Sequence, residues 1–316
     1  MLIFNLPLKK RTVSTIARYV LLLCITSILL TTCASNKALS TADQLESGTL
    51  FLWTVSNEDT QLHILGSIHI APSSIYPLPD TIYSLFDQSP RLLLEINPLE
   101  RDPMDLFDSR RFMEYPVGKR IQDDLNPDEL TRLQTALSEI AIPLGMVENW
   151  QPWVLEAAVI TSAAQEAGIN IEHGIDVHFA LRARQKNLPI DTLETVRQQL
   201  ELFNRIPTRT QAAQLMTSID DYQNINDYLI HLVEMWQSGD ITGLEKTILP
   251  AFGENPELQI YYDQFFLQRN ITWTEILSEY LENGQDAFVV VGAGHLIGPD
   301  SLITMLERRG YQITRY

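Results

Sequence analysis

The chain has 316 residues, a formal net charge of −17 and only two cysteines, Cys24 and Cys33. A chain this acidic repels nucleic acid and anionic lipid head groups, so nucleic acid is excluded as an expected partner. Both cysteines lie near the N-terminus, which excludes disulfides, thiol catalysis and zinc ribbons from the remainder. The sequence also lacks a phosphate loop, a dinucleotide fingerprint, a serine elbow and a zincin helix, and no nucleotide partner is expected.

Residues 1–32 are predicted to be a lipoprotein signal peptide. Lys9, Lys10 and Arg11 precede an apolar run over residues 19–30 that is too short for a permanent membrane span. The segment Leu30-Thr31-Thr32-Cys33 resembles a bacterial lipobox, although threonine replaces the usual Gly, Ala or Ser before the cysteine. Cys33 is therefore the predicted lipidation site. A simple signal peptide and an uncleaved anchor are the alternatives.

This leader predicts a location in the cell envelope, on the periplasmic side or the cell surface, with a lipid anchor holding the chain to the membrane. Residues 33–47 are rich in Ser, Thr, Ala and Asn and are expected to form a flexible tether. Alanine rather than aspartate follows Cys33, which slightly favours the outer membrane. Removing residues 1–32 would take away four basic and no acidic residues, changing the formal charge from −17 to −21.

Residues 48–316 are expected to form one α/β domain with a central mixed, largely parallel sheet flanked by helices. Strands are predicted at residues 49–55 and 61–65, paired around a turn at 56–59, and at residues 91–96, where a leucine run suits burial on both faces. Further along the chain, Asn126-Pro127 is typical of the start of a helix. Helices are predicted over residues 128–140, 153–167 and 175–185, with a short strand at 188–193.

Only helical patterns follow between residues 195 and 283, including residues 211–218, 222–237 and 258–268. The sheet then resumes at Ala287 and ends with a strand at residues 311–314. We therefore interpret residues 195–283 as a helical insertion or lid between the last strands, which would shape a cleft and exclude water from it.

Two segments far apart in the chain share a Gly-x-x-His pattern, Gly66-Ser67-Ile68-His69 and Gly292-Ala293-Gly294-His295. Each follows an apolar run typical of a buried strand and precedes a predicted helix, which starts near Asp80 in the first case and at Gly298-Pro299 in the second. Ligands of open α/β sheets bind beyond the carboxyl ends of the strands. The repeated pattern therefore suggests two loops that lie side by side and direct their histidines inward.

Two glutamates also follow predicted strands, Glu95 after the leucine run and Glu194 after residues 188–193. If these strands are parallel neighbours, His69, Glu95 and His295 face one cleft and form a reasonable divalent-metal site with open positions. Glu194 is then a supporting partner, a further ligand or a general base. The alternative is that the two histidines have only a structural role, because a histidine at a strand end is often held by hydrogen bonds and binds no ligand. An unpaired buried Glu95 would be costly, which favours a functional role for it.

The order and spacing of these motifs resemble the TraB/GumN family, which is related to the animal Tiki proteins. The resemblance covers nearly all of the chain after the leader. It rests on both Gly-x-x-His segments, Glu95 in Leu-Leu-Leu-Glu, Gly174-Ile175-Asp176, Leu193-Glu194-Thr195 with Gln198 or Gln199, Arg269-Asn270 with Trp273, and Arg309-Gly310-Tyr311.

The resemblance implies a fold shared with erythromycin-esterase-like and ChaN-like proteins, and a metal-dependent hydrolase. Tiki relatives are manganese- or cobalt-dependent proteases, and bacterial relatives include proteins that silence peptide pheromones. Carried over by position, His69, Glu95 and His295 are the metal ligands. Glu95, Glu194 and Arg269 are the catalytic candidates, and Arg269 and Asn270 are the substrate-binding candidates.

The leading hypothesis is an envelope hydrolase of peptide or amide bonds, in which Mn²⁺, Co²⁺ or Zn²⁺ activates water and polarises the carbonyl. Arg269 would stabilise the oxyanion or bind a substrate carboxylate. The main alternative is a binding lipoprotein that sequesters a peptide, haem or metal without turnover. A third interpretation is an interaction scaffold in which the Gly-x-x-His loops are only turns.

Overall fold

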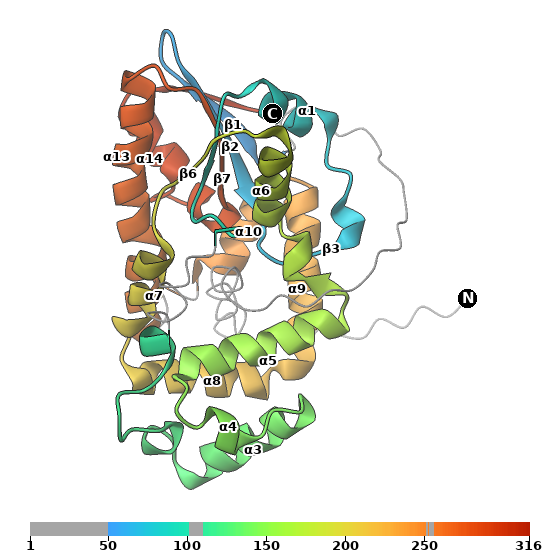
Figure 1. Ribbon diagram of the computed structural model, residues 1–316, viewed down its shortest axis with the longest axis vertical. Coiled ribbons are helices and arrows are strands. Elements are labelled where there is room, and N and C mark those ends of the chain that lie inside the picture. Colours follow the sequence, from blue (N-terminus) through green and yellow to red (C-terminus); the bar gives the residue numbers. More distant parts are fainter. Residues whose placement is uncertain (1–49, 101–109, 251, 253–255) are drawn as a thin grey trace, which may run out of the picture.

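The computed structural model describes residues 50–100, 110–250, 252 and 256–316 (Figure 1). The predicted signal peptide, the lipidation site Cys33 and the tether over residues 33–47 lie outside the described residues. Among those that are described, no helix combines the length and the apolar character needed to cross a membrane.

A six-stranded sheet lies at the centre of the fold, in the strand order β6-β4-β7-β2-β1-β8. The strands are β1 (Leu52–Ser56), β2 (Gln61–Ser67), β4 (Leu92–Leu94), β6 (Ile190–Thr192), β7 (Ala287–Gly292) and β8 (Gln312–Arg315). β6, β4, β7 and β2 run parallel, whereas β1 pairs antiparallel with both β2 and β8. This confirms the predicted mixed, largely parallel sheet flanked by helices.

Helices cover both faces of the sheet because two of its inner strands, β4 and β7, are buried on both faces. Every residue of β4 and β7 is buried. Helices α1 (Asp80–Gln88) and α6 (Ile175–Lys186) pack on one face, where the rings of Phe86, Phe179 and Phe288 lie 4.9–5.4 Å apart. Helices α13 (Gln268–Glu282) and α14 (Leu302–Arg308) lie on the other side of the sheet (Figure 1).

The described residues between β6 and β7 form helices, as predicted for residues 195–283. These are α7 (Val196–Asn204), α8 (Thr208–Asp220), α9 (Tyr222–Gln237), α10 (Ile241–Ile248), α12 (Pro256–Tyr262) and a π-helical turn (Asp263–Leu267) that continues into α13. Thr195 caps α7, since its side chain accepts a hydrogen bond from the N–H of Gln198 while that glutamine reaches back to the cap.

A second, smaller core lies beside the first, where α3 (Pro127–Glu139) and α4 (Leu144–Val147) pack on α5 (Pro152–Glu166) and α8. Leu133, Leu137, Val159 and Leu215 are fully buried there. Figure 1 shows α3 and α4 at the end of the molecule away from the sheet. The remaining short elements are the strand pair β3 (Ala71–Pro72) and β5 (Ile169–Asn170), and 3₁₀ turns at Ser73–Ile75, Ile121–Asp123, Ile171–His173 and Ala293–Leu296.

Three predicted boundaries were wrong. The last helix begins at Leu302 rather than at Gly298-Pro299, because Gly298 has φ +82° and Ser301 provides the cap by accepting from the N–H of Thr304. The helix predicted over residues 258–268 is interrupted by the π-helical turn. The strand predicted over residues 91–96 ends at Leu94, which places Glu95 just beyond the sheet.

Candidate active site

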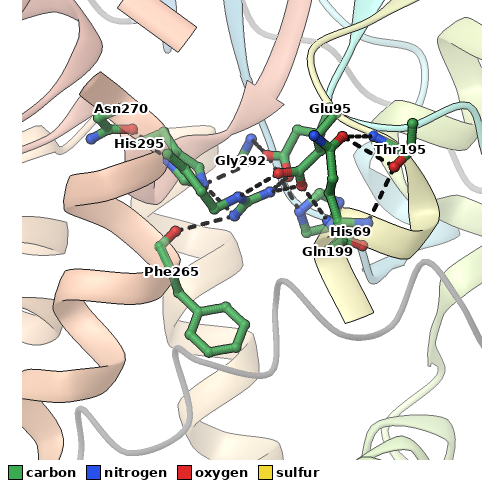
Figure 2. Close-up of polar contacts among 11 residues, drawn as sticks. His69, Glu95, Thr195, Gln199, Phe265, Asn270, Gly292 and His295 are labelled. Carbon is green, nitrogen blue, oxygen red and sulfur yellow. Dashed lines mark hydrogen bonds and ion pairs between the residues drawn. The ribbon is translucent and has the colours of Figure 1, made fainter. Parts of the chain in front are cut away.

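The four polar residues predicted at strand ends lie together at the carboxyl edge of the parallel sheet. The strand register explains this, since Leu94 is opposite both Thr192 and Val290, and Ser67 is opposite Gly292. Glu95, Glu194, His69 and His295 therefore leave the sheet at nearly the same level. Figure 2 shows Glu95 between the two histidines.

Glu95 is the centre of the cluster and is 4% exposed. Its Oε1 accepts a hydrogen bond from the N–H of Gly292 at 2.6 Å and lies 4.0 Å from Nε2 of His69 and 3.8 Å from Nε2 of His295. Its Oε2 accepts from Arg269 at 2.6 Å. Burial raises the pKa of Glu95, but the charge of Arg269 and the nearby histidines outweigh that effect and hold it at about 2. Glu95 is therefore a carboxylate at neutral pH.

Arg269 lies on α13 and links Glu95 to Glu194. All five of its N–H groups donate hydrogen bonds. Nη2 donates to Glu95 and Glu194 at 2.6 Å each, and Nε donates to the second oxygen of Glu194 at 3.2 Å. Nη1 donates to the carbonyl of Phe265, in the π-helical turn, at 3.1 Å and lies 2.9 Å from Nε2 of His295. A guanidinium has five donors, so Arg269 acts here as a fixed positive charge that positions its neighbours.

His295 is held in its neutral form by contacts at both ring nitrogens. Nδ1 lies 2.6 Å from Oδ1 of Asn270, an acceptor, so Nδ1 carries the proton and Nε2 accepts from Arg269. Burial and then the charge of Arg269 lower the pKa of His295 to about 3. The ring of Trp273 lies 4.5 Å away and also faces the guanidinium of Arg269 at 4.3 Å.

His69 differs from His295, because neither of its ring nitrogens has a hydrogen-bond partner among the described residues. Its Nδ1 lies 3.4 Å from a carboxylate oxygen of Asp176, in the first turn of α6. Burial lowers the pKa of His69, but the charges of Asp176 and Glu95 outweigh burial and raise it above 6.5. His69 is therefore an unsatisfied, buried imidazole beside two carboxylates.

Two glycines shape the space around His69. A Cβ at Gly174 would lie 2.4 Å from the carbonyl oxygen of His69, so only glycine lets α6 begin close enough to bring Asp176 to this ring. A Cβ at Gly292 would lie 3.3 Å from both Oε1 of Glu95 and Nε2 of His69. Any side chain at position 292 would therefore crowd Oε1 of Glu95 and Nε2 of His69.

Two cavities border the cluster and have no lining residue in common. A cavity of about 30 Å³ is lined by Ser67, His69 and His295 together with apolar side chains of α9, α10 and the π-helical turn. A larger one, about 160 Å³, is lined by polar side chains that include Glu194, Arg269 and Gln198. The histidines and the Arg269–Glu194 pair therefore line different cavities.

The predicted metal ligands have suitable chemistry but not a suitable arrangement. Two imidazoles and a carboxylate favour a divalent cation. The guanidinium of Arg269, however, lies against Nε2 of His295 and Oε2 of Glu95. Over residues 50–100, 110–250, 252 and 256–316, no group of three or more His, Cys, Asp or Glu side chains is disposed to hold a metal ion. A cation bound by all three residues would require Arg269 to move.

The structure brings five of the sequence-predicted residues together: His69, Glu95, Glu194, Arg269 and His295. The sixth, Asn270, is predicted to bind substrate but lies behind His295, where its Nδ2 donates to the carbonyl of Asp300 at 2.7 Å. In the described part of the chain it lines neither cavity. Asn270 thus holds His295 in place.

Sequence reasoning missed two residues of the cluster, Asp176 and Gln199. Asp176 contacts His69, and Gln199, which is 1% exposed, donates to Glu194 at 3.1 Å. Both belong to motifs that carried the family resemblance, Gly174-Ile175-Asp176 and Gln198 or Gln199. Neither follows a strand of the sheet, so the reasoning from strand ends did not include them.

Comparison with known proteins supports the family. YbaP of Escherichia coli K12, an uncharacterized protein, is 26% identical over 251 residues, or 78% of this chain and 87% of YbaP. An uncharacterized protein of Treponema pallidum is 22% identical over 303 residues, or 92% of this chain and 90% of that protein. The metalloprotease TIKI2 of Xenopus tropicalis is 21% identical over 315 residues, or 83% of this chain and 59% of TIKI2.

No solved structure is significantly similar to this chain. The profile of the TraB/PrgY/GumN family matches residues 51–315, which include both Gly-x-x-His segments and every residue of the cluster described above. The chain therefore belongs to the TraB/PrgY/GumN family.

Proposed function

We propose that this protein is a hydrolase of peptide or amide bonds, with its reaction centre between His69 and Glu95. One observation carries the proposal: Nε2 of His69 is buried and has no hydrogen-bond partner in the described residues, and His69 lines a cavity of about 30 Å³ together with Gly292. Buried polar atoms are normally satisfied, so an unsatisfied one beside a carboxylate indicates a place for a ligand or water. The metalloprotease name of the Xenopus relative supports the same reaction class.

In this proposal His69 is the general base. A water beside Gly292 would lie within reach of Nε2 of His69 and Oε1 of Glu95, and His69 would accept its proton as the oxygen attacks the carbonyl carbon. The carboxylate of Asp176 at Nδ1 keeps the ring oriented and stabilises the imidazolium that forms. The proton then passes from His69 to the leaving amine.

Arg269 and Glu194 support this centre. The N–H groups of Arg269 already donate within the protein, so its contribution is its charge, which keeps Glu95 ionised and His295 neutral. Both oxygens of Glu194 accept from Arg269 and one also accepts from Gln199, an arrangement that suits positioning of the guanidinium better than proton abstraction. A general-base role for Glu194 would require it to release Arg269.

Mn²⁺, Co²⁺ or Zn²⁺ at His69, Glu95 and His295 remains a separate prediction from the sequence. It requires Arg269 to leave Nε2 of His295. Element analysis of protein purified without chelator tests it directly, and a chelator arm in the activity assay tests whether any bound ion is needed.

The test is to incubate the full-length chain with a defined peptide pool and follow cleavage by mass spectrometry. We expect new termini with the wild type and at least a 100-fold slower reaction with His69→Ala, because the general base is lost. His231→Ala is the matched control, since His231 lies exposed on α9, and it should cleave at the wild-type rate.

Two results would refute the hydrolase. The first is unchanged cleavage by a folded His69→Ala variant, which would place the reaction elsewhere or in a contaminant. The second is stoichiometric retention of an intact peptide with no cleavage under any metal or chelator condition, which would favour the binding lipoprotein instead.

A further inference from the structure

The smaller cavity beside His69 has one apolar side and one polar end. Leu232 of α9, Leu244 and Ile248 of α10, and Phe266 of the π-helical turn form the apolar side, and each is at most 3% exposed. Ser67 and His69 form the polar end, next to Glu95. We propose that this cavity is a subsite that takes a small aliphatic side chain of the substrate residue next to the bond that is cleaved. The inference rests on the proposed hydrolysis and names its substrate class.

The polar end of the cavity lacks partners that a substrate backbone would supply. The hydroxyl of Ser67 is 2% exposed and, like Nε2 of His69, makes no hydrogen bond with any part of the chain that the structure describes. Leaving a buried hydroxyl unsatisfied is unfavourable by roughly 1–3 kcal/mol, so such a group in a cavity wall indicates a bound polar atom. The oxygen of a peptide carbonyl fits the hydroxyl of Ser67, while the adjoining side chain fits the apolar wall.

The size and lining of the cavity exclude other side chains. Its volume of about 30 Å³ is two or three times the roughly 10–15 Å³ that one water needs on the same measure, which suits a short aliphatic side chain. A charged side chain would lose its hydration against Leu232, Leu244 and Ile248 without an ion-pair partner on that wall. An aromatic ring would not fit. Valine and leucine are therefore the expected residues.

The test compares peptides of one scaffold that differ only at the residues flanking the cleaved bond. We expect the wild type to cleave beside Val or Leu at least tenfold faster than beside Asp or Phe. Leu244→Ala enlarges the cavity, so the ratio of rates for Phe over Leu should rise about tenfold or more. Leu249→Ala is the matched control: Leu249 is partly buried at the end of α10 and lies outside the lining residues. The ratio of cleavage rates for Phe over Leu should not change in Leu249→Ala.

A binding measurement separates failure of the subsite from failure of the hydrolase. Methyl-labelled protein is titrated with N-acetyl-leucinamide and with N-acetyl-asparaginamide, whose side chains have similar size but different polarity. The proposal predicts shifts of the Leu232, Leu244 and Ile248 methyl signals with the first ligand only. Those shifts without any peptide cleavage would support the subsite and refute the hydrolase.

Two outcomes overturn the subsite. Cleavage that shows no preference for Val or Leu and is unaffected by Leu244→Ala would leave the hydrolase standing and reject the subsite. Absence of both cleavage and methyl shifts would reject both proposals.

Discussion

Gly292 provides the sharpest test at the scale of single residues. A Cβ added there would lie 3.3 Å from both Nε2 of His69 and Oε1 of Glu95, in the space that the mechanism assigns to water. The backbone of Gly292 has φ −52°, which alanine adopts readily, so Gly292→Ala should fold normally. We expect the variant to hydrolyse peptides about 100-fold more slowly than the wild type, because displacement of the reacting atoms by about 1 Å is that costly.

Gly145→Ala is the control for this substitution. Gly145 lies in α4, and an added Cβ there would have no atom of the described residues within 4 Å apart from its chain neighbours and the backbone of its own helix. Its peptide cleavage should match the wild type. Equal rates for Gly292→Ala and Gly145→Ala would show that the space beside Gly292 is not used in the reaction.

Asp176 is predicted to set the pH dependence through His69. Hydrolysis needs neutral His69, so kcat/KM should rise as pH rises through the pKa of His69, which lies above 6.5 largely because of the charge of Asp176. Asp176→Asn removes that charge. The acidic limb of the pH profile should therefore move to lower pH, and the maximal rate should fall about 10- to 100-fold as the ring loses its orientation.

Ring NMR titration of His69 in the same variant gives an independent measurement. The pKa of His69 should be lower in Asp176→Asn than in the wild type. A variant that lost activity with no shift in either the acidic limb or the NMR titration would contradict this role and indicate only a structural contribution from Asp176.

At the residue scale, the sequence predicted which side chains gather at the sheet edge where a residue directly follows a strand. Glu95 was singled out because burying an unpaired carboxylate is unfavourable. The two histidines were singled out because the Gly-x-x-His segment occurs twice. That logic singled out neither Asp176 nor Asn270, since each contacts a histidine from a helix. Such contacts depend on how α6 and α13 pack on the sheet edge, which spacing along the chain does not reveal.

At the scale of elements, Glu156 links the packing of α5 and α8 to pH. It is 1% exposed, and its Oε1 accepts from the hydroxyl of Ser218 at 2.7 Å. Burial raises its pKa to about 8, compared with 4.5 when exposed. The folded state then binds more protons than the unfolded state between these values, so the free energy of unfolding should fall as pH rises from about 4.5 to 8.

Glu156→Gln removes this titration and should flatten that part of the stability curve. At pH 8 we expect the variant to be more stable than the wild type, by on the order of 1–3 kcal/mol, because no charge is buried. Chemical denaturation at pH 5 and pH 8 measures the change. Glu166→Gln, an exposed change on the same helix, is the control. A Glu156→Gln variant with the wild-type pH dependence would contradict the account.

Helix and strand positions followed from the sequence where local signals are strong. The Asn126-Pro127 start of α3 and the ends of α9 agree with the pattern, because capping and apolar periodicity act within a few residues. The π-helical turn before α13 was missed, since its residues keep an ordinary helical pattern. The carbonyl of Phe265 in that turn accepts a hydrogen bond from Arg269. The turn therefore occurs together with a contact at the site, which a local helical pattern does not reveal.

At the scale of the whole molecule, the strands that precede the polar site residues are neighbours in the sheet. A shared cleft for His69, Glu95, Glu194 and His295 was predicted on the condition that their strands are parallel neighbours, and β2, β7, β4 and β6 are adjacent in the sheet. The second core around α3 and α4 was not anticipated, because apolar residues at helical spacing do not specify which helix they contact.

The signal peptide predicted for residues 1–32 gives a testable expectation for the protein in the cell. If Cys33 is lipidated, the wild type should incorporate labelled palmitate and fractionate with membranes, because acyl chains anchor a protein through buried methylene groups. Cys33→Ser should lose both properties. Membrane association that persists in this variant without label would favour an uncleaved anchor instead.

The central claim is that two loops from distant parts of the chain act as one hydrolytic unit. The most direct measurement is kcat/KM for the wild type, His69→Ala, His295→Ala and the double variant on one cleaved peptide. Residues that act as a unit have non-additive effects. The double variant should therefore be about as active as the less active of the two single variants. Losses that multiply in the double variant, or a folded single variant with wild-type activity, would contradict a shared site.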